Sequence, residues 1–304
     1  MHRFFRLLGR EFVIGLPFTW LAVFFFLPFL ILAYISFVEM GNDIHPFKPL
    51  WDSASGVLNL KYENYSSIFR AEGGALFDTL YLEAYGRSLK YAFATATLCL
   101  AVGYPFAYFL ARASAHVRPA LLMMVMLPFW TSFLLRVYAW MGLLDSSETG
   151  LINQALLGLG VVAEPLPLLY NTGAVLVGMV YSYLPFMVLP LYANLVKLDL
   201  RLLEAARDLG ARPATVFLRV TLPLSLRGIV AGSMLVFIPA VGEFVIPDLL
   251  GGGSVMTIGR SIWDDFGPNQ DWPMAAAVAV LMVAMLIAPI VLLHRHGRRA
   301  GRGE

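Results

Sequence analysis

The sequence has little of two things that soluble proteins use freely: cysteine and charge. Its 304 residues include one cysteine, Cys99, so the chain can form neither an internal disulfide nor a cysteine-based metal cluster. Only 14% of the residues are charged, whereas soluble domains carry about 25%. With 59% hydrophobic residues and a mean hydropathy of +0.72, the composition excludes an ordinary soluble domain. It indicates a protein with several membrane-spanning segments.

A nucleotide-binding motif is also absent. The phosphate-cradling pattern GxxxxGK[ST] occurs nowhere in the sequence. The glycine-rich stretch Leu249–Ser254 lacks the lysine that such a loop needs. We therefore do not expect this chain to hydrolyse ATP or to be an enzyme.

Six long apolar segments carry few or no charges, and we expect each to be a helix because lipid offers backbone groups no hydrogen-bond partner. Arg136 interrupts the third segment, and Glu243 and Asp248 interrupt the fifth. The first has 25 uncharged residues, more than the 7–15 of a cleaved signal peptide, and is expected to remain as a span. The segments are Ile14–Val38, Tyr91–Ala111, Pro119–Leu144, Asn171–Leu195, Ile229–Leu250 and Trp272–Leu293.

The distribution of lysine and arginine predicts the orientation of the chain. If the N-terminus lies inside, most of these residues fall on the cytoplasmic side, and the opposite loop over residues 39–87 is acidic. The sequence therefore predicts an all-α membrane protein with six transmembrane helices and with both termini in the cytoplasm. Residues 1–304 would form a single transmembrane domain, and residues 39–87 a long outer loop.

A charged hairpin over residues 196–228 separates the fourth and fifth segments on the predicted cytoplasmic side. Asp199 is expected to cap a first helix, and Gly210 to end it. Pro213 suits the first turn of a second helix, which Pro223 is expected to break before the fifth span. The apolar face of the first helix would be formed by Leu202, Leu203, Ala206 and Leu209.

This hairpin resembles the EAA motif of permease subunits in binding-protein-dependent ABC importers. It reads Glu204-Ala205-Ala206, three residues, Gly210, nine residues, Val220, one residue and Leu222-Pro223, with valine where the family usually has isoleucine. Stretches between Gly103 and Gly253, such as GYPFAYFLAR and FIPAVGEFVIPDLLGG, are similar to spermidine/putrescine permeases of the PotB/PotH type.

The resemblance implies the six-helix core of a type I ABC importer permease in the bacterial inner membrane, with residues 39–87 in the periplasm. The partners that it implies are a dimer of ATP-binding subunits, a second homologous permease, a periplasmic substrate-binding protein and membrane lipid, but no nucleic acid. No cofactor is expected in this chain, since the ATP-binding partner would hold ATP and Mg²⁺. The coupling residues that it implies are Glu204, Ala205, Ala206, Arg207, Asp208 and Gly210.

Ionisable groups within spans are candidates for a transport path. Glu243 lies between Pro239 and Pro247, where a broken helix would expose backbone carbonyls that favour a cation, together with the carboxylate. Aromatic rings nearby could hold ammonium groups by cation–π contacts of about 0.5–2 kcal/mol. The candidate path residues are Glu243, Arg136, Trp130, Tyr138, Tyr181, Tyr183, Phe244 and Asp248.

Each of these assignments has a structural alternative. Glu243 and Arg136 could pair with each other or extend to the outer headgroups, and the aromatic residues could form an interfacial belt. Asp248, Asp264 and Asp265 could simply solvate an outer loop. Two alternative functions also remain at this point: an ABC permease for ferric ion or an organic anion, and a secondary transporter driven by an ion gradient.

Overall fold

The computed structural model describes residues 2–42, 45–51, 60–69 and 79–300, and this part of the chain is mainly helical. Four helices are long and apolar enough to cross a membrane: Phe12–Ile35, Leu80–Arg112, Thr172–Leu195 and Pro213–Val241. A bent pair, Arg118–Trp130 and Phe133–Leu144, provides a fifth if it counts as one span. The helical membrane fold is therefore confirmed. That the chain has six spans, and that both termini lie in the cytoplasm, stay predictions.

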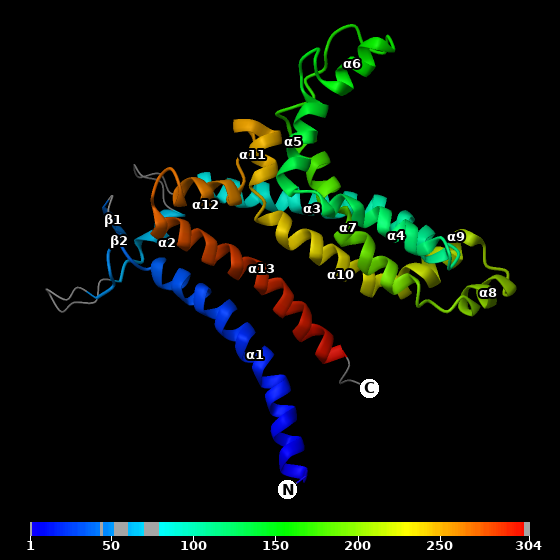
Figure 1. Ribbon diagram of the computed structural model, residues 1–304, viewed down its shortest axis with the longest axis horizontal. Helices are drawn as coiled ribbons and strands as arrows, with labels where there is room; N and C mark the ends of the chain where they lie inside the picture. Colours follow the sequence, from blue (N-terminus) through cyan, green and yellow to red (C-terminus); the bar gives the residue numbers. More distant parts are fainter. Residues whose placement is uncertain (1, 43–44, 52–59, 70–78, 301–304) are drawn as a thin grey trace. The chain divides into compact units, whose positions relative to one another are not determined.

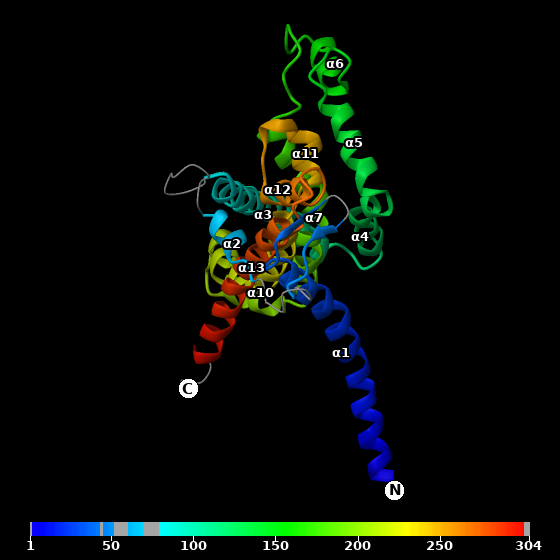
Figure 2. The same ribbon diagram turned by 90° about the vertical axis from the view of Figure 1, so that its left-hand side faces the viewer.

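The chain divides into two compact units, Met1–Leu82 with Ser261–Glu304, and Glu83–Arg260. The first unit contains α1 (His2–Ile35), β1 (Met40–Asn42), β2 (His45–Phe47), α2 (Glu63–Ser67) and α13 (Trp272–Ala300). Helices α1 and α13 approach each other at the end that carries the two strands and diverge toward the chain termini (Figures 1 and 2). Parts of the expected outer loop, residues 43–44, 52–59 and 70–78, lie outside the described residues.

The end of this unit that carries the two strands is built by polar contacts around a small antiparallel hairpin that the sequence did not predict. Met40 pairs with Phe47 across the two strands. The Glu39 carboxylate forms ion pairs with Lys48 at 3.3 Å and Lys61 at 3.1 Å. The hydrogen bond from Lys61, with Lys48 in support, holds the pKa of the Glu39 carboxyl below its usual value. These contacts fix the chain that enters and leaves the hairpin.

The second unit is organised around α7 and α10, which pack along each other, with α11 against α7 and α5. Gly228 permits the close approach, because a Cβ there would lie 2.8 Å from Asn194 Cβ and 3.1 Å from the Pro190 carbonyl oxygen. The elements are α3 (Thr79–Arg112), α4 (Arg118–Met126), η1 (Leu127–Trp130), α5 (Phe133–Leu144), α6 (Leu151–Gly158), α7 (Thr172–Leu195), α8 (Arg201–Asp208), α9 (Pro213–Val216), η2 (Phe217–Thr221), α10 (Leu222–Val241), α11 (Val245–Gly251) and η3 (Gly252–Ser254). Helix α12 (Ile258–Phe266) follows and leads to α13.

Two helix boundaries differ from the sequence predictions. The third apolar segment is not one helix, because η1 contains Pro128 and is followed by extended backbone at Thr131 and Ser132, so that α4 and α5 meet at 89°. Pro223, in contrast, does not break the helix before the fifth span. It occupies the first turn of α10, where a missing N–H is tolerated, and the π-helical turn η2 joins α9 to α10 without interruption.

Candidate coupling hairpin and translocation path

The coupling hairpin, residues 196–228, has the helix–turn–helix structure that the sequence predicts. Helix α8 ends in a Schellman arrangement: the Gly210 N–H donates to the Arg207 carbonyl at 2.8 Å, and the Ala211 N–H to that of Ala206 at 3.1 Å. Gly210 has a φ of +82°, a conformation that a side chain would disfavour. Pro213 begins α9, as predicted. The N-cap residue of α8 is Leu200 and not Asp199, although the Asp199 carboxylate accepts a hydrogen bond from the Arg201 N–H at 3.0 Å.

The hairpin buries one face and leaves the other exposed. Leu203 and Val216 are buried, each 4% exposed, whereas Leu209 is 89% exposed. The predicted apolar face is thus only partly covered. Residues 196–228 are all described, and none of Glu204, Arg207 and Asp208 forms an ion pair there. The predicted coupling residues Glu204, Ala205, Arg207, Asp208 and Gly210 are exposed, and Ala206 is half-buried.

Aromatic contacts connect the hairpin to the membrane helices. Phe217, in the π-helical turn, packs edge-on against Tyr104 of α3 with ring centroids 5.6 Å apart. The Tyr104 hydroxyl in turn lies 2.9 Å from the buried Ser225 hydroxyl at the start of α10. A displacement of the hairpin would therefore reach α3 and α10 through packed side chains.

The fifth apolar segment is broken at the predicted place. Helix α10 ends at Val241, α11 begins at Val245, and Glu243 lies in the gap. One carboxylate oxygen of Glu243 accepts hydrogen bonds from the backbone N–H groups of Val245 at 3.0 Å and Ile246 at 3.3 Å. The other accepts a hydrogen bond from the Tyr183 hydroxyl. Glu243 thus caps α11 and anchors it to α7.

Arg136 does not pair with Glu243, so that structural alternative is wrong. Its guanidinium lies over the rings of Phe129 and Phe133, 5.2 and 5.8 Å from their centroids. Within the described residues, its Nε and Nη1 atoms are buried and have no hydrogen-bond acceptor. The alternative that Arg136 extends to the outer headgroups stays untested.

Two aromatic residues that sequence reasoning missed connect these groups. Phe186 lies one turn after Tyr183 on α7, and their ring centroids are 6.2 Å apart. Phe186 also packs edge-on against Phe129 at 5.1 Å, and Phe129 contacts Arg136. A continuous row of rings therefore runs from the Glu243 carboxylate to the Arg136 guanidinium. The spacing of Tyr183 and Phe186 on one helix face was the available signal.

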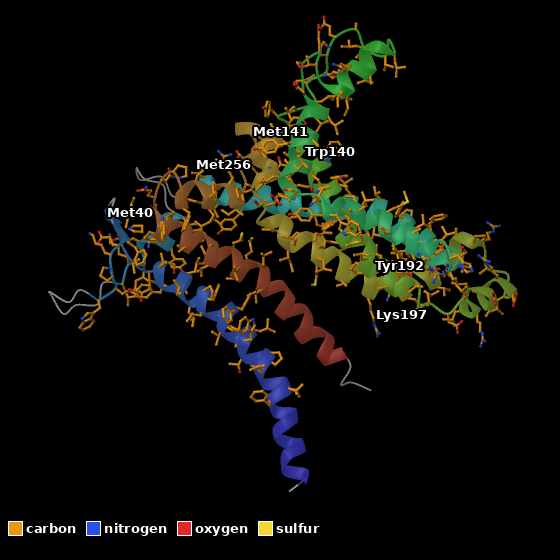
Figure 3. All side chains as sticks on the ribbon, in the orientation of Figure 1. Met40, Trp140, Met141, Tyr192, Lys197 and Met256 are labelled. Atoms are coloured by element: carbon orange, nitrogen blue, oxygen red, sulfur yellow. The ribbon has the colours of Figure 1, made fainter. Side chains whose placement is uncertain are left out.

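The remaining path candidates are dispersed. Trp130 is 74% exposed and Tyr138 55%, and no described contact brings either to Glu243. Tyr181 packs instead against Trp140 of α5, with ring centroids 5.5 Å apart. Trp140 is labelled in Figure 3. Phe244 follows Glu243 in the gap between α10 and α11.

Two of the three aspartates considered as loop residues, Asp248 and Asp265, have partners within the chain. Asp248 of α11 forms an ion pair with Arg260, so it is not a free carboxylate. Asp265 is 7% exposed and accepts hydrogen bonds from the Tyr81 hydroxyl at 2.9 Å and the Asn269 amide at 3.1 Å. The idea that Asp265 merely solvates a loop is therefore wrong.

Comparison with known proteins gives the family. Residues 10–299 match the model of the binding-protein-dependent transport system inner membrane component. The chain belongs to this family. It is 36% identical to the spermidine/putrescine transport system permease protein PotB of Haemophilus influenzae, covering 96% of both chains. It is 39% identical to the protein of that name from Escherichia coli, covering 92% of this chain and 94% of the relative.

The fold of this family member also matches a solved structure. A bacterial alginate ABC transporter, crystallised in complex with its alginate pentasaccharide-bound periplasmic protein, contains a chain with a TM-score of 0.70. The match covers 99% of each chain at 15% identity. At that identity the likeness establishes the fold alone. The family match and the relatives named as permeases identify the chain as a membrane component of a binding-protein-dependent transport system.

Proposed function

We propose that this family member is one of two permease subunits in an ATP-driven importer for spermidine and putrescine. The observation that carries the proposal is the coupling hairpin, an anchored helix pair whose charged face forms no ion pair with any residue that the structure describes. A transporter driven only by an ion gradient has no need of such a surface. The choice of polyamines rests on the relatives named for spermidine and putrescine transport.

The coupling step follows from the contacts of the hairpin. A dimer of ATP-binding subunits would hold ATP and Mg²⁺ and receive α8, where Glu204 and Asp208 lie one turn apart and offer anions to basic groups. Closure of that dimer would push the hairpin, and the Phe217–Tyr104 and Tyr104–Ser225 contacts would pass the displacement to α3 and α10. In this proposal the hairpin and both termini lie in the cytoplasm.

The transport path would pass the break between α10 and α11. The Glu243 carboxylate, the Tyr183 hydroxyl and the neighbouring rings are groups that suit an ammonium ion. Because Glu243 already accepts three hydrogen bonds, a passing polyamine would compete for this carboxylate. Displacement of the Tyr183 hydroxyl would then loosen the hold of α11 on α7.

The test is reconstitution of the transporter in proteoliposomes with its ATP-binding subunit, second permease and periplasmic binding protein. We expect uptake of radiolabelled spermidine that requires ATP on the side of the vesicle membrane that corresponds to the cytoplasm. Uptake should stop when the ATP-binding subunit is omitted. Uptake by this chain alone, driven by an ion gradient, would refute the proposal. ATP-dependent uptake of another solute without uptake of spermidine or putrescine would refute the cargo.

A further inference from the structure

Arg136 carries a charge that the described part of the chain does not balance. It is the fourth residue of α5, in the bent helix pair that would form one span. Its guanidinium lies over Phe129 and Phe133, and its buried Nε and Nη1 atoms have no acceptor among the described residues. Within those residues it also forms no ion pair. The two rings replace part of the lost hydration, but an ionised group at membrane depth normally pairs with an opposite charge.

The carboxylates at the break between α10 and α11 do not supply this charge. Glu243 accepts hydrogen bonds from the Tyr183 hydroxyl and from two backbone N–H groups. Asp248 forms its ion pair with Arg260. Aromatic rings lie between Glu243 and the guanidinium and keep the two charges apart. The counter-charge of Arg136 therefore has to come from outside this part of the chain.

One end of the guanidinium is open to such a group. Arg136 is half-buried, and its burial falls on Nε and Nη1, so that the third nitrogen, Nη2, lies toward the surface. The neighbouring side chains are apolar or aromatic and are exposed, namely Trp130, Leu134, Leu135 and Tyr138. Arginine together with tryptophan and tyrosine is the composition that is enriched where protein subunits meet.

The backbone next to Arg136 indicates that lipid does not cover this surface. The chain is extended at Thr131 and Ser132, between η1 and α5, and both residues are exposed. Non-helical backbone at membrane depth is tolerated where it contacts protein or lines a water-filled cavity, because lipid cannot satisfy its N–H and C=O groups. Water would hydrate the open nitrogen of Arg136 but would not balance its charge. A protein carboxylate would do both.

We infer that Arg136 binds a carboxylate of the second permease, in an ion pair that forms when the two subunits assemble. The inference rests on the proposed function, because that function supplies the second permease as the protein partner at membrane depth. Spermidine and putrescine are cations that Arg136 would repel, so they are not the counter-charge. The Phe129 and Phe133 rings hold the guanidinium in place, so that little side-chain freedom is lost when the carboxylate binds.

The isolated chain and the complex should respond to the loss of Arg136 in opposite directions. In the isolated chain the unpaired charge costs stability, so Arg136→Met should leave the unfolding temperature unchanged or higher. In the complex the same substitution leaves the carboxylate of the second permease without its partner, so the affinity between the two permeases should fall. An arginine that only supports the fold of its own chain would instead lower the stability of the isolated chain when it is replaced.

The experiment measures the Kd between this chain and the second permease of the same transport system, by energy transfer between the labelled full-length subunits in mild detergent. Thermal unfolding of each isolated variant measures its stability. Arg118→Met is the matched control, because the Arg118 Nη2 atom donates to the Ala111 and Ala113 carbonyl oxygens at 3.2 and 2.9 Å within the chain. We expect Arg136→Met to raise Kd at least about tenfold. Arg118→Met should lower the unfolding temperature and change Kd less than about twofold.

A double-mutant cycle identifies the carboxylate. Each aspartate and glutamate in the membrane segments of the second permease is replaced by asparagine or glutamine. One of these replacements should raise Kd as much as Arg136→Met does. Combined with Arg136→Met, it should raise Kd less than about twofold further, because both substitutions remove the same ion pair.

Three outcomes would overturn the inference. The first is an unchanged Kd in Arg136→Met, and the second is a Kd that changes additively with every carboxylate replacement. The third is binding of a dissolved dicarboxylate that Arg136→Met abolishes while the permeases assemble normally, since the counter-charge would then belong to a cargo. If the unmodified permeases do not associate at all, the two-permease arrangement of the proposed function is itself refuted, and the inference with it.

Discussion

The coupling hairpin and the break at Glu243 belong to the same unit but satisfy their charges in opposite ways. In the hairpin, Glu204, Arg207 and Asp208 are exposed and form no ion pair within residues 196–228. At the break, Glu243 accepts hydrogen bonds from one tyrosine and two backbone N–H groups, and Asp248 pairs with Arg260. The charges of the hairpin are available to bind another chain, whereas the charges at the break are bound by groups of the same chain.

The difference indicates which charges are available for function. A free, exposed charge on a rigid element contributes little to the stability of this chain and can set the register of a partner. A half-buried carboxylate that caps a helix first serves the fold, and substrate can engage it only by competing with those hydrogen bonds. Substitutions should therefore impair coupling without loss of fold at α8, and affect both at the break.

The largest expected effect is at α8. Glu204→Lys should reduce ATP-dependent spermidine uptake at least about tenfold, because reversing a charge at a docking surface opposes the partner's basic groups. Thermal stability of the isolated permease should stay unchanged, since Glu204 is exposed and forms no ion pair with a described residue. Uptake by proteoliposomes and thermal unfolding in detergent measure the two quantities.

Glu148→Lys is the matched control for Glu204→Lys, because it reverses an exposed glutamate outside the coupling hairpin. It should leave both uptake and spermidine-stimulated ATP hydrolysis near the normal rate. If Glu204→Lys hydrolysed ATP with normal stimulation, α8 would not be the docking element.

The rigid connection between the two regions can be tested at Gly228, where α10 crosses α7. Gly228→Ala places a Cβ 2.8 Å from Asn194 Cβ, and we expect a loss of stability of about 1–3 kcal/mol. Gly142→Ala on α5 is the control, since nothing lies within 4 Å of its added Cβ. A normal unfolding temperature in Gly228→Ala would show that the helices can separate at no cost.

At the break we expect a smaller effect, in which substitutions of Glu243 change uptake and stability to different extents. Glu243→Gln keeps an oxygen to cap α11 but removes the charge, so uptake should fall about tenfold while stability changes by less than about 1 kcal/mol. Glu243→Ala should lose the cap as well, and Tyr183→Phe should lose only one hydrogen bond. Uptake kinetics and thermal unfolding of the three variants separate charge from capping. Normal uptake by Glu243→Gln would make this residue a cap alone.

The sequence predicted the hairpin well because its signals are local. Gly210, Pro213 and the EAA spacing act within a few residues, and the Schellman turn and the start of α9 appear where these residues place them. The break at Glu243 was predictable for the same reason. The prediction that Pro223 breaks the helix was wrong because proline is compatible with the first turn of a helix, and its effect depends on where that turn begins.

Features that depend on distant contacts were not predictable. Phe129 and Phe186 join across two helices, and Arg136 turns to rings rather than to the carboxylate that sequence position suggested. Trp272 at the start of α13 packs against Phe47 of β2, more than 200 residues earlier in the chain. No local pattern marks such contacts, since they arise only when the helices pack.

The smallest effect is expected at Asp265. Its carboxylate represents a third arrangement of a charged group, since it is buried in the first unit and accepts hydrogen bonds from Tyr81 and Asn269. Burial raises the pKa of its carboxyl above the ordinary value, although the two hydrogen bonds oppose this shift. The folded protein therefore holds the proton more tightly than the unfolded chain, and stability should fall as pH rises from the ordinary aspartate pKa of about 3.9 through the raised value. Thermal unfolding between these values should show this decline in the unmodified protein and lack it in Asp265→Asn. An identical pH dependence in the two proteins would mean that Asp265 titrates alike in both states, and that its burial costs the fold nothing.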